Sequence, residues 1–141
     1  YKDAQYVYDK AKEIYSESKI IVYGRSLGCT FAIHVAAKNN PQKLILETPF
    51  YSLKSIVDAR YPILPSGLLL RFKFPSYQFI KEVACPIYSF HGTEDSVVPY
   101  ENGKSLIELS NQTKLITILG GDHNNLASYE KYWEELKIIL A

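Results

Sequence analysis

The 141-residue sequence contains no methionine, only two cysteines and one tryptophan, and no excess of charge of one sign. Cys29 and Cys85 are too few for a disulfide scaffold, and a domain of this size buries enough surface to fold without one, so we interpret both as reduced and structural. Sixteen basic against fifteen acidic residues give a formal net charge of +1. This balance argues against a nucleic-acid-binding protein, which needs a strong positive field.

Long apolar runs are also missing. No stretch approaches the roughly 20 apolar residues of a membrane span, and the first residues lack the basic-then-apolar order of a signal peptide. We therefore expect neither an anchor nor an export signal in this sequence and favour a cytoplasmic location, while a membrane surface stays open as a partner. The chain opens at Tyr1 instead of an initiator methionine, so we expect its natural N-terminus to lie elsewhere.

Strand-like and helix-like segments alternate along the chain. Apolar residues recur every three or four positions over 3–15, which indicates an amphipathic helix. Short apolar runs without alternation indicate strands covered on both faces; they span 19–23, 43–48, 86–92 and 114–121. Further helices are predicted over 27–38, 100–109 and 128–140. The alternation predicts a single α/β domain, 1–141, whose parallel sheet is wound right-handed.

A long interruption, 50–81, separates the second and third predicted strands. It contains three prolines and no strand period, and five basic residues accompany its single acid, Asp58. We predict an excursion of short helices that forms a cap or lid. One interpretation is a solvated cover over the body. The sharper hypothesis is that Leu69 and its leucine neighbours line an acyl pocket, with Arg71 and Lys73 facing an anionic group.

The first predicted strand leads directly into Gly24-Arg25-Ser26-Leu27-Gly28 and then into a helix. This strand, tight turn and helix are the context of a nucleophile elbow. A serine at the tip of such a turn has a strained backbone that exposes its hydroxyl, and we expect Gly24 and Gly28 to let strand and helix approach closely. The backbone N–H of Leu27, at the helix N-terminus, would face a developing oxyanion.

Two further loops offer the partners that a serine nucleophile needs. Glu94 and Asp95 follow the third predicted strand, and His123 follows the fourth. The carboxyl ends of parallel strands share one edge of the sheet with the elbow, which is where open α/β sheets bind ligands. The chain order of serine, acid and histidine is that of the α/β-hydrolases.

Over nearly its whole length the sequence resembles the α/β-hydrolase superfamily. The segments IIVYGRSLGCTFA, FHGTEDSVVPYENG and ILGGDHNNL are similar to the compact abhydrolase-domain and serine-aminopeptidase-like hydrolases, a group that includes protein depalmitoylases. The resemblance implies a nucleophile at Ser26, an acid at Asp95, which it favours over Glu94, and a general base at His123. Members carry about half a sheet before the elbow helix, whereas only 18 residues precede the elbow strand here. We therefore expect the C-terminal portion of a longer hydrolase, lacking its N-terminal strands and poorly active alone.

Several other polar residues have more ordinary interpretations. Asp122 reads as a surface or turn residue, His91 as a structural histidine that holds its loop, and His34 as a packing residue of a helix. Arg25 could meet an anionic substrate group or form a salt bridge at the edge of the sheet. Because no second ligand stands at metal-binding spacing, we predict no metal and no cofactor.

These features predict a serine hydrolase that cleaves a carboxylic ester, thioester or amide through an acyl-enzyme on Ser26. A carboxylesterase or thioesterase is the leading subclass, and the substrate is expected to be a small molecule or an acyl or peptidyl group. A serine peptidase of the same fold is the alternative within this class. A non-catalytic binding module that keeps the three residues by descent is the alternative from another class.

Overall fold

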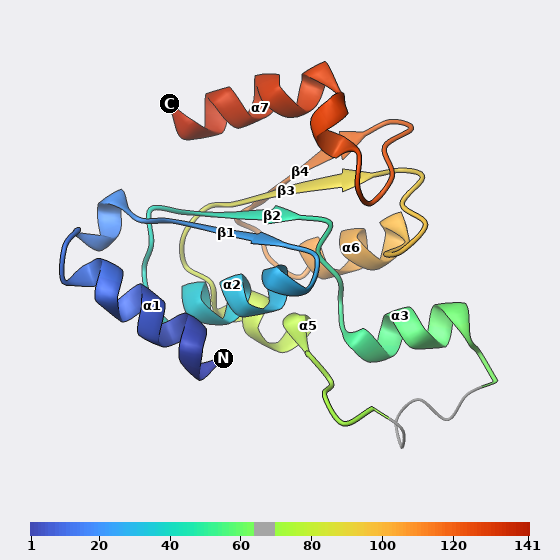
Figure 1. Cartoon of the computed structure of the whole chain (residues 1–141), viewed down its shortest axis with the longest axis horizontal. Coiled ribbons are helices and arrows are strands. Elements are labelled where there is room, and N and C mark those ends of the chain that lie inside the picture. Colours follow the sequence, from blue (N-terminus) through green and yellow to red (C-terminus); the bar gives the residue numbers. More distant parts are fainter. Residues whose placement is uncertain (64–69) are drawn as a thin grey trace.

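The computed structural model describes residues 1–63 and 70–141, and its centre is a sheet of parallel strands in the order β1-β2-β3-β4 (Figure 1). The elements follow one another as α1 (Lys2–Lys12), β1 (Ile21–Arg25), α2 (Leu27–Lys38), β2 (Lys43–Glu47), α3 (Leu53–Arg60), α5 (Ser76–Phe79), β3 (Ile87–Gly92), α6 (Tyr100–Ile107), β4 (Thr113–Ile118) and α7 (Glu130–Leu140). Short 3-10 helices lie at Glu17–Lys19, Ile80–Glu82 and Leu126–Ser128. The predicted parallel α/β fold is confirmed.

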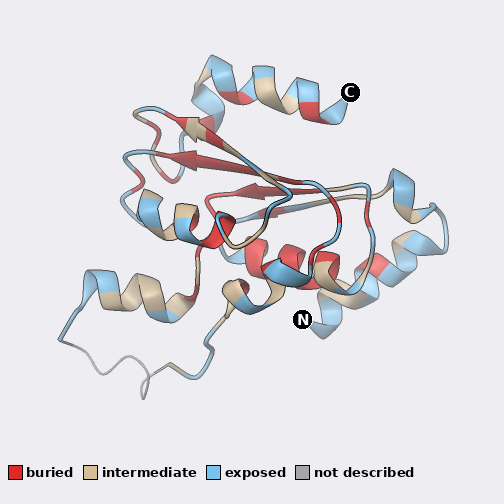
Figure 2. Cartoon of the chain, turned by 180° about the vertical axis from the view of Figure 1, so that it is seen from behind, coloured by how far each residue is buried: buried red, intermediate tan, exposed pale blue. Residues whose placement is uncertain are grey.

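Helices cover both faces of this sheet. α1, α2, α5 and α6 lie on one side and α7 lies on the other (Figure 1). Because successive side chains of a strand point to opposite faces, Leu44 and Leu46 of β2 pack with the buried residues of α2. Ile45, between them, packs in a second cluster with Phe90 and Tyr132. Figure 2 shows that burial is concentrated in the strands and in the helix faces turned toward them.

The first helix and strand differ from the sequence prediction at their ends. α1 ends at Lys12, so Ile14 and Tyr15, predicted to lie on its apolar face, are exposed. β1 extends to Arg25 because Gly24 and Arg25 still pair with β2. The prediction that this strand is covered on both faces is wrong, since β1 lies at an edge of the sheet and Tyr23 is 48% exposed.

The segment predicted as a cap, 50–81, is anchored in the body at both ends. Phe50 and Ile80 are buried, and the hydroxyls of Ser76 and Thr30 form a buried hydrogen bond of 3.0 Å between α5 and α2. α3, in contrast, contains no buried residue and extends away from the sheet (Figures 1 and 2). The ends of the segment therefore belong to the core, and α3 is its peripheral part.

Two isoleucines of this segment should separate its anchored and peripheral parts. Ile80 is fully buried and Ile63 is 95% exposed. We expect Ile80→Ala to lower the free energy of unfolding by about 2–5 kcal/mol because it leaves a cavity in the core, and Ile63→Ala to change it by less than about 0.5 kcal/mol. Urea denaturation measures both, and equal effects would contradict the anchoring.

Candidate active site

Ser26 lies at the reversal of the chain between β1 and α2, and its backbone has φ 50° and ψ −118°. Positive φ is uncommon for a residue other than glycine and marks a strained turn. Two hydrogen bonds hold the turn: the Ser26 N–H donates to the Glu47 carbonyl at 2.8 Å, and the Ser26 carbonyl accepts from the Cys29 N–H at 3.0 Å. This is the backbone geometry that the sequence predicts for a nucleophile elbow.

The two glycines of the turn have different roles. A Cβ on Gly24 would lie 2.7 Å from both the Ala32 Cβ and the Gly28 carbonyl oxygen, so only glycine fits where β1 meets α2. A Cβ on Gly28 would meet no atom within 4 Å. The expectation that both glycines permit the close approach therefore holds for Gly24 and is wrong for Gly28, which faces open space.

Asp95 lies in the loop after β3, and its side chain is fully buried. One carboxylate oxygen, Oδ1, accepts the backbone N–H groups of Val97 at 2.9 Å and Val98 at 2.7 Å. The other, Oδ2, lies 2.8 Å from Nδ1 of His123. The neighbouring Glu94 is exposed, so the loop turns Asp95, and not Glu94, toward the histidine.

Two opposing effects act on the Asp95 carboxyl. Burial raises its pKa, whereas hydrogen bonds from His91, from His123 and from two backbone amides lower it. The hydrogen bonds prevail, and the pKa lies below its ordinary value. Asp95 is therefore a carboxylate at neutral pH, able to stabilise a positive charge on His123.

His91, at the end of β3, supports the acid loop from inside the protein. It is fully buried, and its Nε2 donates to the Val98 carbonyl at 3.0 Å and lies 3.5 Å from Oδ2 of Asp95. A Cβ on Gly103 would lie 2.2 Å from Nδ1 of His91, so α6 approaches the imidazole only through a glycine. The sequence suggests a loop-holding histidine here but gives no sign of its pairing with Gly103.

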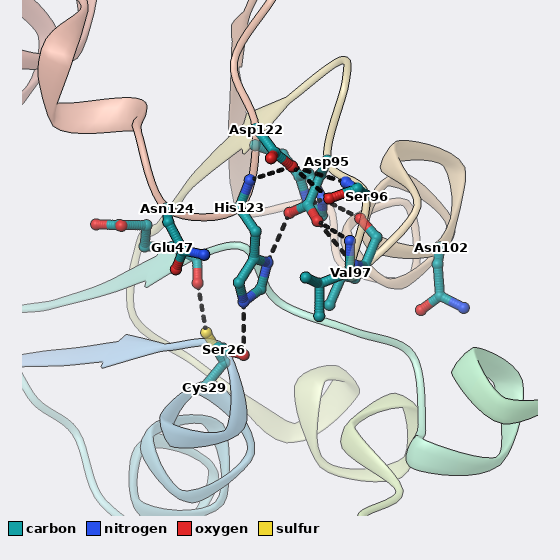
Figure 3. A network of polar contacts seen from close by, with 12 residues as sticks. Ser26, Cys29, Glu47, Asp95, Ser96, Val97, Asn102, Asp122, His123 and Asn124 are labelled. Carbon is teal, nitrogen blue, oxygen red and sulfur yellow. Dashed lines mark hydrogen bonds and ion pairs between the residues drawn. The ribbon is translucent and has the colours of Figure 1, made fainter. Parts of the chain in front are cut away.

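His123 joins the acid to the serine, as Figure 3 shows. Its Nε2 lies 3.0 Å from Oγ of Ser26. Because a carboxylate only accepts hydrogen bonds, the Asp95 contact fixes the proton on Nδ1 and leaves Nε2 free to accept from the serine hydroxyl. The three residues come from loops after β1, β3 and β4, and this arrangement can accept a proton from Ser26 as its oxygen attacks a substrate.

Asp122 ties the loop of the histidine to the loop of the acid. Its Oδ1 accepts the Ser96 N–H at 2.8 Å, the Ser96 hydroxyl at 3.0 Å and the His123 N–H at 2.8 Å (Figure 3). Sequence reasoning assigned Asp122 to a turn but missed the bridge. The sequence signal that could have found it is the position of Asp122 directly before His123, since the loop that carries Asp95 must end at the same edge of the sheet.

The remaining candidates make no contact with the side chains of Ser26, His123 or Asp95, or they lie outside the described residues. Arg25 forms a salt bridge with Glu47, its Nε lying 3.0 Å from Oε1. Leu69 falls in 64–69, outside the described residues. Its neighbour Leu70 borders a surface pocket of about 390 Å³ between α3 and α5, which Lys73 also lines. Arg71 is exposed and stacks over the ring of Phe72.

The other polar groups near the site are engaged in packing. Burial raises the pKa of the Cys29 thiol well above its ordinary value, and the thiol donates to the carbonyls of Gly24 and Glu47, so it is no rival nucleophile. His34 is buried beside Tyr1 and Phe79. Within residues 1–63 and 70–141 no group of three or more His, Cys, Asp or Glu side chains could hold a metal ion. In the same ranges, no helix combines the length and apolar character needed to cross a membrane.

Comparison with known proteins identifies relatives at the level of sequence, although no protein-family model matches the chain. The protein Rv2307c of Mycobacterium tuberculosis is 31% identical over 108 residues, 77% of this chain and 38% of that protein. Human alpha/beta hydrolase domain-containing protein 17B is 29% identical over 119 residues, 84% of this chain and 40% of the relative. The chain thus spans about two fifths of the length of these curated relatives.

Solved structures share the fold at lower identity. The monoacylglycerol lipase of Paleococcus ferrophilus superposes with a TM-score of 0.70 at 16% identity, over 99% of this chain and 73% of the lipase. A puromycin-hydrolyzing peptidase of Mycobacterium tuberculosis gives a TM-score of 0.71 at 17% identity, over 98% of this chain and 23% of the peptidase. The chain has the fold of both enzymes.

Substitution of the two elbow glycines should have opposite consequences for stability. We expect Gly24→Ala to lower the free energy of unfolding by about 1–3 kcal/mol, the usual cost of overpacking a core. The loss should lie at or above the upper end of that range, because the backbone of Gly28 would have to move. Gly28→Ala should be neutral or stabilising by up to about 1 kcal/mol, because alanine is the better helix former. Thermal and urea unfolding measure both. A destabilised Gly28→Ala would contradict the observation that a Cβ at this position meets no other atom.

The lowered pKa of Asp95 predicts how stability depends on pH. A carboxyl whose folded pKa is depressed contributes stability that is fully present above its ordinary pKa of 3.8 and is lost as the pH falls through the lowered value. We expect Asp95→Asn to cost about 1.5–3 kcal/mol at neutral pH, because hydrogen bonds to a charged group weaken. The difference from the parent should shrink below pH 3.8.

Urea titrations between neutral pH and about pH 2.5, below the ordinary range of an aspartate, measure this difference. Glu94→Gln, which neutralises the exposed neighbour, is the matched control and should change stability by less than about 0.5 kcal/mol. A pH-independent effect of Asp95→Asn would count against the hydrogen-bonded carboxylate.

Proposed function

We propose that this chain, which belongs with the alpha/beta hydrolase domain-containing proteins by sequence similarity, carries the nucleophile, acid and base of a serine hydrolase that cleaves an ester, thioester or amide. The observation that supports this most directly is the continuous path from Ser26 Oγ to His123 Nε2 at 3.0 Å and from His123 Nδ1 to Asp95 Oδ2 at 2.8 Å. The strained backbone of Ser26 supports the same role.

The proposed reaction proceeds in two halves. His123 Nε2 takes the hydroxyl proton while Ser26 Oγ attacks the carbonyl carbon of the substrate, and Asp95 stabilises the resulting imidazolium. The bond to the leaving group then breaks as His123 passes it the proton, which leaves an acyl ester on Ser26. Water, deprotonated by His123, attacks this ester; the acid departs, and the proton returns to Ser26.

The start of α2 supplies the proposed oxyanion contact. Leu27 is the first residue of this 12-residue helix, and the first backbone N–H groups of a helix have no partner within it and carry partial positive charge. We assign the Leu27 N–H to the oxygen that becomes negative when Ser26 attacks. One oxyanion donor contributes about 10²- to 10³-fold to turnover where it has been measured.

The leaving group separates two candidate activities of the same site. The lipase neighbour suggests an alcohol leaving group, and the puromycin-hydrolyzing neighbour suggests an amine. Either leaving group can depart through the same acyl-enzyme chemistry. We propose an esterase or thioesterase first and a peptidase as the second candidate. Relative rates on a p-nitrophenyl acyl ester and a matched p-nitroanilide would rank them.

Covalent labelling tests the nucleophile directly. We expect a fluorophosphonate probe to add one adduct to the full-length gene product, detected by intact-protein mass, and we expect no adduct on Ser26→Ala. Ser18→Ala, which removes an exposed hydroxyl remote from the elbow, should label like the parent. Equal hydrolysis of a p-nitrophenyl ester by the parent and Ser26→Ala would instead favour a non-catalytic binding module.

A further inference from the structure

We propose that Arg25 is a positioning residue: held by Glu47, its guanidinium fixes the His123 loop at hydrogen-bonding distance from Ser26. This inference rests on the proposed hydrolase function, because it concerns the distance across which the proton moves. It also gives Arg25 a role that differs from direct contact with substrate. A set of hydrogen bonds among β1, β2, α7 and the loop after β4 supports this role.

Glu47 is the fixed end of this set. It pairs in register with Arg25 at the carboxyl ends of β2 and β1, and its side chain is 10% exposed. Oε1 accepts from Nε of Arg25 at 3.0 Å. Oε2 accepts from the Tyr132 hydroxyl at 2.9 Å and from the Tyr23 hydroxyl. The carboxylate is thus held by one cation and two phenols from two elements, β1 and α7.

The two phenols are permanent donors to this carboxylate. Burial, together with the adjacent Glu47, raises the pKa of Tyr23 well above its ordinary value. Burial also raises the pKa of Tyr132. Both hydroxyls therefore keep their protons, and so can donate to Glu47, throughout the pH range in which the protein would work.

The guanidinium reaches the base loop from its other side. Nη2 of Arg25 donates to the backbone carbonyl of His123 at 2.9 Å and to Oδ1 of Asn124 at 2.7 Å. One contact is to the backbone of His123 and the other is to the side chain of the next residue. Because Asp122 already ties this loop to the acid loop, Arg25 provides the missing tie on the side of the serine.

Glu47 also contacts the nucleophile through its backbone. Its carbonyl accepts the N–H of Ser26 at 2.8 Å. One residue of β2 thus holds Ser26 directly and holds the His123 loop through Arg25. Both ends of the distance between Ser26 Oγ and His123 Nε2 are therefore held by the same strand, β2. If the loop alone moves away, it must break a hydrogen bond of the Arg25 guanidinium.

Arginine is the side chain that this geometry requires. Its planar group directs Nε toward Glu47 and Nη2 toward the loop at the same time, whereas lysine offers one compact charge that cannot span both directions. The Arg25 side chain is 43% exposed, so the salt bridge should add little to global stability. Loss of Arg25 should therefore affect turnover more than folding.

The test compares three variants of the full-length gene product on p-nitrophenyl acetate, a neutral substrate. We expect Arg25→Met, which keeps the aliphatic stem, to lower kcat by about 10- to 100-fold, since a displacement of 1 Å can cost 10²-fold, with KM changed less than about threefold. Arg25→Lys should recover only part of kcat. Lys114→Met, which breaks an ion pair with Glu135 between β4 and α7, is the matched control and should keep full activity.

A fourth variant and a second readout separate positioning from misfolding and from inactivity. Asn124 is exposed, so Asn124→Ala should fold normally and lower kcat by a smaller factor of about 2- to 5-fold, since one contact of the guanidinium remains. Hydrogen exchange of the backbone amides over 119–127 should speed up in Arg25→Met and, less so, in Asn124→Ala. Exchange in β2 should stay unchanged in both.

Each outcome decides the proposal. A lower kcat at nearly constant KM, with faster exchange confined to the loop, supports positioning. A raised KM at constant kcat, or unchanged loop exchange, overturns it and returns Arg25 to substrate contact or to a surface ion pair. If the parent neither labels with a fluorophosphonate nor hydrolyses esters, the proposed function fails, and so does the proposed effect of Arg25 on turnover. Loop exchange still shows separately whether the tie exists.

Discussion

The parallel direction of the strands is the constraint on which the whole site depends. β1, β3 and β4 each end at the same edge of the sheet, so the residues that follow them meet there although they are up to 97 positions apart in sequence. Pairing in register also aligns the strand ends, Arg25 beside Glu47 and Gly92 beside Ile118. The serine, acid and histidine therefore need only short loops to come into contact, and short loops are easily held rigid.

Within that framework the strained turn at Ser26 requires support from its surroundings. A residue held at positive φ costs about 1–3 kcal/mol. Hydrogen bonds from the Ser26 N–H to Glu47 and from the Cys29 N–H to Ser26, together with dense packing at Gly24, offset that cost. The acid and base loops are held by polar contacts instead, through His91, Asp122 and Arg25. Packing and backbone hydrogen bonds thus fix Ser26, while side-chain hydrogen bonds position Asp95 and His123.

The sequence sufficed to predict what depends on local pattern and chain order. Apolar periodicity located the strands and helices, and the polar residues after three strand ends indicated that Ser26, Asp95 and His123 would lie close together, as they do. It could not reveal contacts set by register between strands or by helix packing. The pairing of Arg25 with Glu47, the approach of Gly103 to His91 and the open space beside Gly28 are of this kind. The sequence also did not predict the exposure of Tyr23 in β1, because a continuous apolar run does not distinguish an edge strand from a central one.

The bridge between Asp122 and Ser96 has a consequence for how such a protein can diversify. Because this carboxylate joins the loops after β3 and β4, lengthening either loop would separate groups that must stay together. The connection between β2 and β3 is not tied to either of these loops by Asp122, and in its described residues burial is confined to the parts near its two ends, while α3 projects outward. Insertions and rapid sequence change should therefore accumulate around α3, where new substrate contacts can arise without disturbing the proton-transfer path.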